Sequence, residues 1–287
     1  MPGYYEQRRS RAALWCARLA SVSLPYFAIV ILLHRFEKVA TPQAYWLVGF
    51  GLILILFALF LGARAIVDMW NHGYSGGRLT VRGLLIAILL LLPFAWFGYL
   101  AVLHPSINDV STNPYSPPGF IRAANIRADQ AAQGMNQLAN YTPPYATLLI
   151  ESYPKLASRR YNAGARRIYA AAAALITDRD WLVTGVTGLP DEANAPAEGE
   201  QETQPESEAR LETAVPLDIH VEALARSMIF AFHYDVVLQI VSEEESTLVD
   251  MRVAARWGRH DFGASARIIE KFLADLDASL LGIAGEG

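Results

Sequence analysis

Three long apolar runs lie within the first 103 residues, at positions 14–33, 45–67 and 84–103. Each holds about 20 residues or more, and about 20 helical residues at 1.5 Å each cross a hydrocarbon core roughly 30 Å thick. No comparable run follows in the rest of the chain. The sequence therefore predicts a three-helix transmembrane region, residues 1–103, followed by a separate domain, residues 104–287.

Bulk composition conceals this division, because the chain is 53% hydrophobic overall and its charged residues lie mostly outside the runs. The net charge of −4 gives no basic surplus, which argues against a nucleic-acid partner. The predicted partner of the three apolar runs is the lipid bilayer. The only cysteine, Cys16, lies in the first run, so neither an internal disulfide nor a thiolate metal site in the domain is expected.

Basic residues flank the runs unevenly. Arginines crowd around the start of the first run and recur after the second, whereas the first connection carries one arginine and one lysine. Since basic residues stay on the cytoplasmic side, we expect a cytoplasmic N-terminus and a periplasmic domain in a bacterial inner membrane. A cleaved signal peptide is an alternative interpretation of the first run, although the later runs would still anchor the chain.

The domain alternates helical and strand patterns, which predicts an α+β fold with an antiparallel sheet of about four strands packed by two helices. Pro143 and Pro144 are expected to end the first helical stretch. The helical patterns cover residues 123–138, 163–177 and 263–281. The strand patterns cover residues 181–186, 218–226, 234–241 and 247–256.

An acidic tract interrupts the domain at residues 190–216. It contains eight acidic residues, a single base, Arg210, and few apolar side chains. Such a composition cannot bury enough surface to offset the entropy of ordering, so the tract is predicted to be a disordered loop between two strands. Binding of a cation or a basic partner is the alternative interpretation.

Three segments of the domain carry recurring polar residues. They are 107–120 (INDVSTNPYSPPGF), 230–238 (FAFHYDVVL) and 249–272 (VDMRVAARWGRHDFGASARIIEKF). Together they resemble the domain of unknown function 1499 family, whose pattern the third segment matches at Asp250, Arg252, Arg256, Gly258, Asp261, Gly263 and Arg267. The resemblance implies a shared fold and a recurring polar cluster, but it brings no established activity.

The match departs from the family pattern at three positions. Val253 and Ala255 stand where relatives often have serine, and Ser265 stands where they often have asparagine. A hydroxyl nucleophile on the last strand is therefore not available in this chain.

Period-two alternation in the last predicted strand places Asp250, Arg252, Ala254 and Arg256 on one face. The residues between them, Met251, Val253, Ala255 and Trp257, are then expected to face the core. One hypothesis is a site for an anion such as a carboxylate, a phosphate or a lipid headgroup, because arginine binds such groups in a bidentate manner. Its candidate residues are Arg252, Arg256, Arg259, Asp261, Asn108, Asp109, Ser111 and Thr112.

The alternative hypothesis is a structural network without a ligand. In it, Arg252 and Arg256 pair with Asp109, Asp235 or Asp250 and hold the opening segment 107–120 on the sheet. Arg267 is a further candidate member of this network. We favour this hypothesis because the opening segment is poor in apolar residues and needs polar anchors to stay ordered.

The leading functional hypothesis is a non-enzymatic inner-membrane protein whose exported domain binds a partner protein, an envelope component or a small anionic ligand. One alternative is a hydrolase-like periplasmic enzyme that uses His260 or Asp261 near Ser111 and Thr112; another is an assembly factor or subunit of a membrane complex. No catalytic set, cofactor or metal is predicted, since no two of the six histidines share a metal-ligand spacing.

Overall fold

The computed structural model describes residues 8–189 and 217–283. The chain divides into two compact units. The first consists of Met1–Leu103 with Met228–Ala231, and the second of His104–Ser227 with Phe232–Gly287. The acidic tract predicted to be disordered, 190–216, lies outside the described residues.

Three helices form the first unit: α1 (Arg11–Arg35), α2 (Thr41–His72) and α3 (Gly77–Leu103). Each is long and apolar enough to cross a membrane, so the three apolar runs do form three long helices, as predicted. Small residues allow the helices to approach closely. A Cβ atom added at Gly83 of α3 would lie 2.7 Å from Sγ of Cys16 on α1, so a larger residue there would force the two helices apart.

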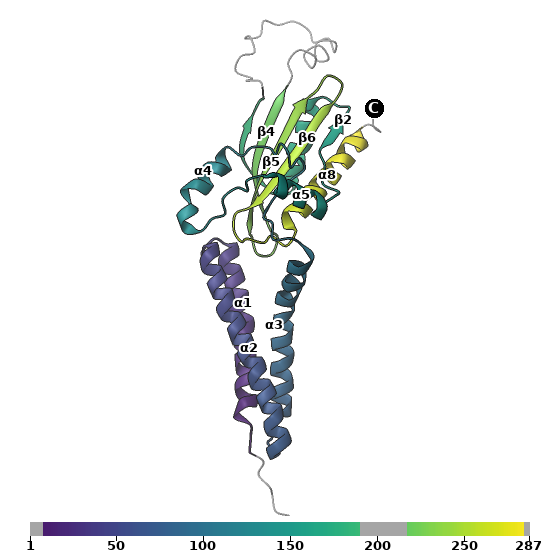
Figure 1. Ribbon diagram of the computed structural model, residues 1–287. Coiled ribbons are helices and arrows are strands. Elements are labelled where there is room, and N and C mark those ends of the chain that lie inside the picture. The colour runs from purple at the N-terminus through teal and green to yellow at the C-terminus, as the bar shows by residue number, and fades with distance from the viewer. Residues whose placement is uncertain (1–7, 190–216, 284–287) are drawn as a thin grey trace, which may run out of the picture. The chain divides into compact units, whose positions relative to one another are not determined.

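An antiparallel sheet forms the centre of the second unit (Figure 1). Its strand order is β1-β6-β5-β4-β3, and β2 also pairs with β6. The sheet therefore has six strands rather than the predicted four. The strands are β1 (Asp109–Ser111), β2 (Arg159–Tyr161), β3 (Leu182–Thr187), β4 (Asp218–Arg226), β5 (His233–Ser242) and β6 (Thr247–Ala255).

The two unpredicted strands, β1 and β2, are short and lie along the same edge of β6. With three residues each, they are too short to show an alternating pattern in the sequence. The first predicted helical stretch ends early, as α4 (Arg122–Asp129) and a short 3₁₀ turn, Ala131–Gln133. The expected role of Pro143 and Pro144 is wrong, because α5 (Pro143–Ser152) begins there; proline is favourable in the first helical turn, where its missing N–H has no partner to lose.

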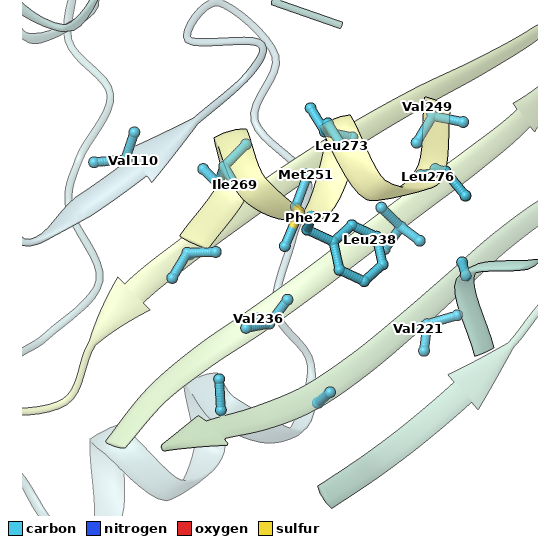
Figure 2. Packing of buried hydrophobic residues seen from close by; sticks show 14 of the residues in the cluster. Val110, Val221, Val236, Leu238, Val249, Met251, Ile269, Phe272, Leu273 and Leu276 are labelled. Carbon is cyan, nitrogen blue, oxygen red and sulfur yellow. The ribbon is translucent and has the colours of Figure 1, made fainter. Parts of the chain in front are cut away.

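The main core lies between one face of the sheet and the helices α6 (Ala165–Asp178) and α8 (Ala264–Ile283). Figure 2 shows the apolar side chains of α8 directed at the strands, with Phe272 over Leu238. Val249, Met251, Val253 and Ala255 of β6 lie in this core, which confirms the predicted alternation at 251, 253 and 255; Trp257 lies beyond the end of the strand and outside the core cluster.

The opposite face of the sheet, here called the network face, carries Ala254 and Val237 together with several charged side chains. Phe120 and Ala123 pack on it in a small second cluster. Apolar contact on this face is therefore limited, and polar contacts hold much of the covering chain in place.

Candidate functional site

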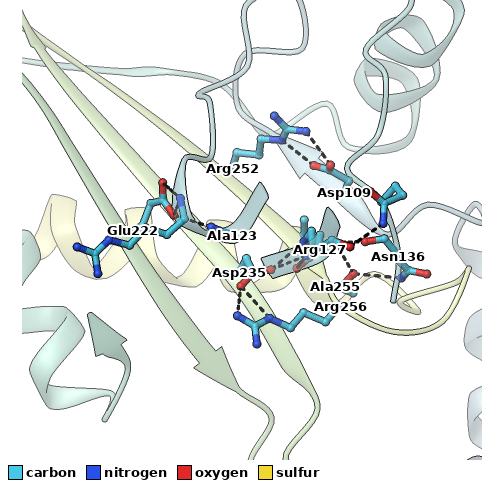
Figure 3. Close-up of polar contacts among 12 residues, drawn as sticks. Asp109, Ala123, Arg127, Asn136, Glu222, Asp235, Arg252, Ala255 and Arg256 are labelled. Atoms are coloured by element: carbon cyan, nitrogen blue, oxygen red, sulfur yellow. Dashed lines mark hydrogen bonds and ion pairs between the residues drawn. The ribbon is translucent and has the colours of Figure 1, made fainter. Parts of the chain in front are cut away.

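The strand register brings the candidate residues of the network face together. Ala254 on β6 lies opposite Asp109 on β1 and opposite Asp235 on β5, so two aspartates flank one small residue. Two residues along β6 and on the same face, Arg252 lies opposite Ser111 and Val237. Figure 3 shows Arg127, Arg252 and Arg256 gathered with Asp109 and Asp235 on this face, and Arg127 Nη2 donates to the Ala254 carbonyl at 2.9 Å.

Arg252 forms a bidentate ion pair with Asp109. Nε donates to Oδ1 at 2.9 Å and Nη2 donates to Oδ2 at 2.8 Å, while Nη1 donates to the Pro118 carbonyl at 3.2 Å. The rings of Phe120 and Tyr141 lie 5.2 and 4.7 Å from the guanidinium carbon, a distance typical of cation–π contacts. Burial acts against the charged form of Arg252, but the ion pair with Asp109 outweighs it and raises the pKa.

Asp109 also holds the chain that leads away from the opening segment. Its carboxylate accepts hydrogen bonds from the Tyr141 hydroxyl and the Ala139 N–H, both at 2.9 Å. Burial and the nearby carboxylate raise the pKa of Tyr141 well above its ordinary value, so its hydroxyl stays protonated and donates. Each oxygen of Asp109 therefore has two donors within the domain.

Asp235 is shared by two arginines. Arg256 donates to Oδ1 from Nε at 2.9 Å and from Nη2 at 2.7 Å, whereas Arg127 of α4 donates to Oδ2 from Nε at 2.9 Å. The Arg127 side chain is only 1% exposed, and its other donors reach the carbonyls of Asn136, Ala254 and Ala255. Burial lowers the pKa of Arg127, and the attraction of Asp235 opposes this shift.

Glu222 of β4 fixes the start of α4. Its carboxylate accepts hydrogen bonds from the N–H groups of Ile121, Arg122 and Ala123, the last at 3.1 Å. A carboxylate is favourable there, because the first N–H groups of a helix have no partner within the helix and the helix dipole is positive at that end. Helix α4 is thus held on the sheet at one end by Glu222 and at the other by Arg127.

Asp250 binds hydroxyl and amide groups instead of arginine. It accepts a hydrogen bond from Thr112 Oγ1 at 2.7 Å, from the Ser158 hydroxyl and from the Asn113 side chain. Thr112 Oγ1 in turn accepts from the Met251 N–H at 3.0 Å. The Ser111 hydroxyl bonds to the backbone of Asn113, so the two candidate hydroxyls, those of Ser111 and Thr112, are engaged inside the fold.

The turn between β6 and α8 contains the residues of the hydrolase hypothesis. Asp261 accepts hydrogen bonds from the N–H groups of Gly263 and Ser265 at 2.9 and 2.8 Å, and therefore stabilises the start of α8. His260 Nδ1 accepts from the Phe262 N–H at 2.9 Å. Ser265 is completely buried, so its hydroxyl is not open to a substrate.

The remaining candidates lie around this turn. The Asn108 amide donates to the Gly258 carbonyl at 3.1 Å, and Arg267 donates to the Phe262 carbonyl at 3.0 Å. The Arg259 side chain is exposed and takes no part in the network described above. Within residues 8–189 and 217–283, no group of three or more His, Cys, Asp or Glu side chains is arranged to hold a metal ion.

Two central residues, Arg127 and Glu222, were missed by the sequence analysis. Both lie just outside the three segments with recurring polar residues, and the short helix that carries Arg127 is polar along most of its length. The available signal was the number of carboxylates. Asp109, Asp235 and Asp250 lie on buried strands and require donors, and Arg252 of β6 together with Arg256 just after it does not satisfy all three.

In this site the buried arginines and aspartates pair with one another, and the candidate hydroxyls of Ser111 and Thr112 form hydrogen bonds inside the domain. No curated protein and no solved structure matched the chain in the comparisons. The model of the family described as "Protein of unknown function (DUF1499)" matches residues 109–276, from the first residue of β1 into α8. This match covers more than half of the chain and includes every element of the network face, so the chain belongs to the DUF1499 family.

Proposed function

We propose that this protein is a non-catalytic, membrane-anchored protein whose α+β domain binds a partner protein of the bacterial envelope. The observation that carries the proposal is the use of Arg252 and Arg256 inside the domain, where Asp109 and Asp235 neutralise them. Arginines that are already neutralised by buried aspartates bind a small anionic ligand poorly. Recognition then has to use the outer surface of the domain rather than the network face.

The edge strand β3 is the surface best suited to a protein partner. It is the last strand in the sheet order, and no strand within the described residues lies on its outer side. Leu182 and Val183 are 59% and 47% exposed there. An exposed edge offers unpaired N–H and C=O groups to an incoming strand, and adjacent apolar side chains add contact area.

A photo-cross-linking amino acid at position 182 is expected to capture a partner of one size in intact membranes. The same amino acid at position 115 serves as control, because Tyr115 is 76% exposed but lies in the opening segment. The adducts are identified by mass spectrometry after solubilisation in mild detergent. Equal capture from both positions, or capture from 115 alone, would contradict a partner site at β3.

We also propose that the N-terminal arginines lie in the cytoplasm and the domain in the periplasm. Three crossings would put the residues before α1 and those after α3 on opposite sides of the membrane, and the arginines before α1 favour the cytoplasm for that end. In a Cys16→Ala background, Tyr115→Cys is expected to react with an impermeant maleimide in spheroplasts, and Ser75→Cys only in inverted vesicles. The reverse labelling pattern would show that the orientation is wrong.

A further inference from the structure

The arginine-bearing end of the three-helix unit is built from two segments that the fold joins. The Ser10 N–H donates to the Ser75 carbonyl at 2.9 Å, and the Ser75 N–H donates to the Arg8 carbonyl at 3.0 Å. This short pairing places Arg9 and Arg11 beside the start of α3. The basic residues here are therefore positioned by backbone hydrogen bonds and are not merely close in sequence.

A cavity of about 460 Å³ lies between these segments. Three arginines line it: Arg9 and Arg11 from one segment, and Arg78 from α3. No carboxylate among residues 8–189 and 217–283 pairs with any of the three; the described ion pair of the helical unit, Arg64 with Asp68, does not line the cavity. Helices α1 and α3 also begin here, which adds the positive ends of two helix dipoles.

A second hollow of about 690 Å³ continues from the first along the outer side of α3. The two share Gly77 and Arg78, and the second is lined otherwise by Arg82 and by three apolar side chains, Val81, Leu85 and Ile86. The Val81 and Leu85 side chains are 57% and 63% exposed. An arginine-lined cavity thus opens directly onto an apolar groove that runs along a membrane helix.

We propose that this composite cavity binds an anionic phospholipid. The phosphate lies among Arg9, Arg11 and Arg78, and one acyl chain follows Val81 and Leu85. Arginine suits the headgroup because its planar guanidinium donates in pairs to phosphate oxygens. The apolar groove favours a lipid over free phosphate, because inorganic phosphate carries the same kind of charge but has no acyl chain to bury in the groove. Basic pockets at the ends of membrane helices are a general means of holding anionic lipid headgroups.

The test uses the full-length protein in nanodiscs that contain phosphatidylglycerol and phosphatidylcholine in equal amounts. After transfer to detergent, native mass spectrometry counts the lipids that remain bound. The protein is expected to retain phosphatidylglycerol preferentially, and the R9Q/R78Q variant is expected to lose this preference by more than about tenfold, at roughly fivefold for each charge. The control is Arg18→Gln, which removes an exposed arginine of α1 that does not line the cavity.

Three outcomes would overturn the proposal. Equal retention of the two lipids would show that the cavity does not select charge. If Arg18→Gln lowers the preference for phosphatidylglycerol as much as each substitution in R9Q/R78Q does, the lipid is attracted to the basic surface in general and not to the cavity. Displacement of the lipid by millimolar inorganic phosphate, with glycerophosphoglycerol bound as tightly as the lipid, would show a site for free phosphate. Helical circular dichroism of each variant confirms that the helices remain folded.

Discussion

Replacing Asp235 with asparagine is expected to lower the free energy of unfolding of the domain by about 3–5 kcal/mol. The substitution removes the charge shared by Arg127 and Arg256 but leaves both guanidiniums in place. Arg127 is 1% exposed and cannot turn to water without the detachment of α4 from the sheet. Hydrogen exchange of β5 and β6 peptides, measured across a guanidinium chloride series in detergent, reports the loss directly.

The matched control is Glu243→Gln, which breaks an ion pair of similar geometry at the surface. Arg160 Nε donates to Glu243 Oε2 at 3.0 Å, but the Arg160 side chain is 63% exposed. Exposed pairs gain little because water solvates each partner equally well alone. Peptides from β6 should therefore exchange as in the unmodified protein. If Asp235→Asn and Glu243→Gln lower the free energy of unfolding equally, burial is not the reason why the Asp235 carboxylate stabilises the domain.

The elements that the sequence could predict are those with long, regular patterns. The three apolar runs correspond to α1–α3, and the residues 218–226 and 247–256 correspond closely to β4 and β6. Within β6, the alternation between Met251 and Arg252 assigned each side chain to its face, because side chains of a strand alternate regardless of what covers them. Local geometry alone determines these features, so a single sequence is sufficient.

The features that escaped prediction depend on how distant segments meet. Strands β1 and β2 exist only because β6 offers them an edge, and three residues carry no pattern of their own. The partners of Asp235 could be named only in part, since Arg256 directly follows the neighbouring strand β6, whereas Arg127 lies on a helix, 108 positions before Asp235. That helix directly follows the opening segment, so its place on the network face depends on where that segment lies.

Whether the network face can also bind an anion depends on how fully Asp109 neutralises Arg252. Asp109→Asn alone is expected to cost about 3–5 kcal/mol, because it leaves a guanidinium that is 7% exposed without its counter-charge. The D109N/R252M double variant should recover most of this loss. Methionine fills a similar volume without a charge, and the asparagine can still accept from Tyr141 or Ala139. Buried ion pairs are often replaced by neutral residues at little cost in stability.

This double-mutant cycle separates the two hypotheses for the network face, because stability and binding respond differently. If Arg252 serves only to hold the opening segment, the double variant should be both stable and able to form the cross-link from position 182. If Arg252 instead grips a ligand that the partner supplies, the double variant should be stable but unable to cross-link. Additive losses in stability would show that Asp109 does not neutralise Arg252, and the guanidinium would then be available to an anion after all.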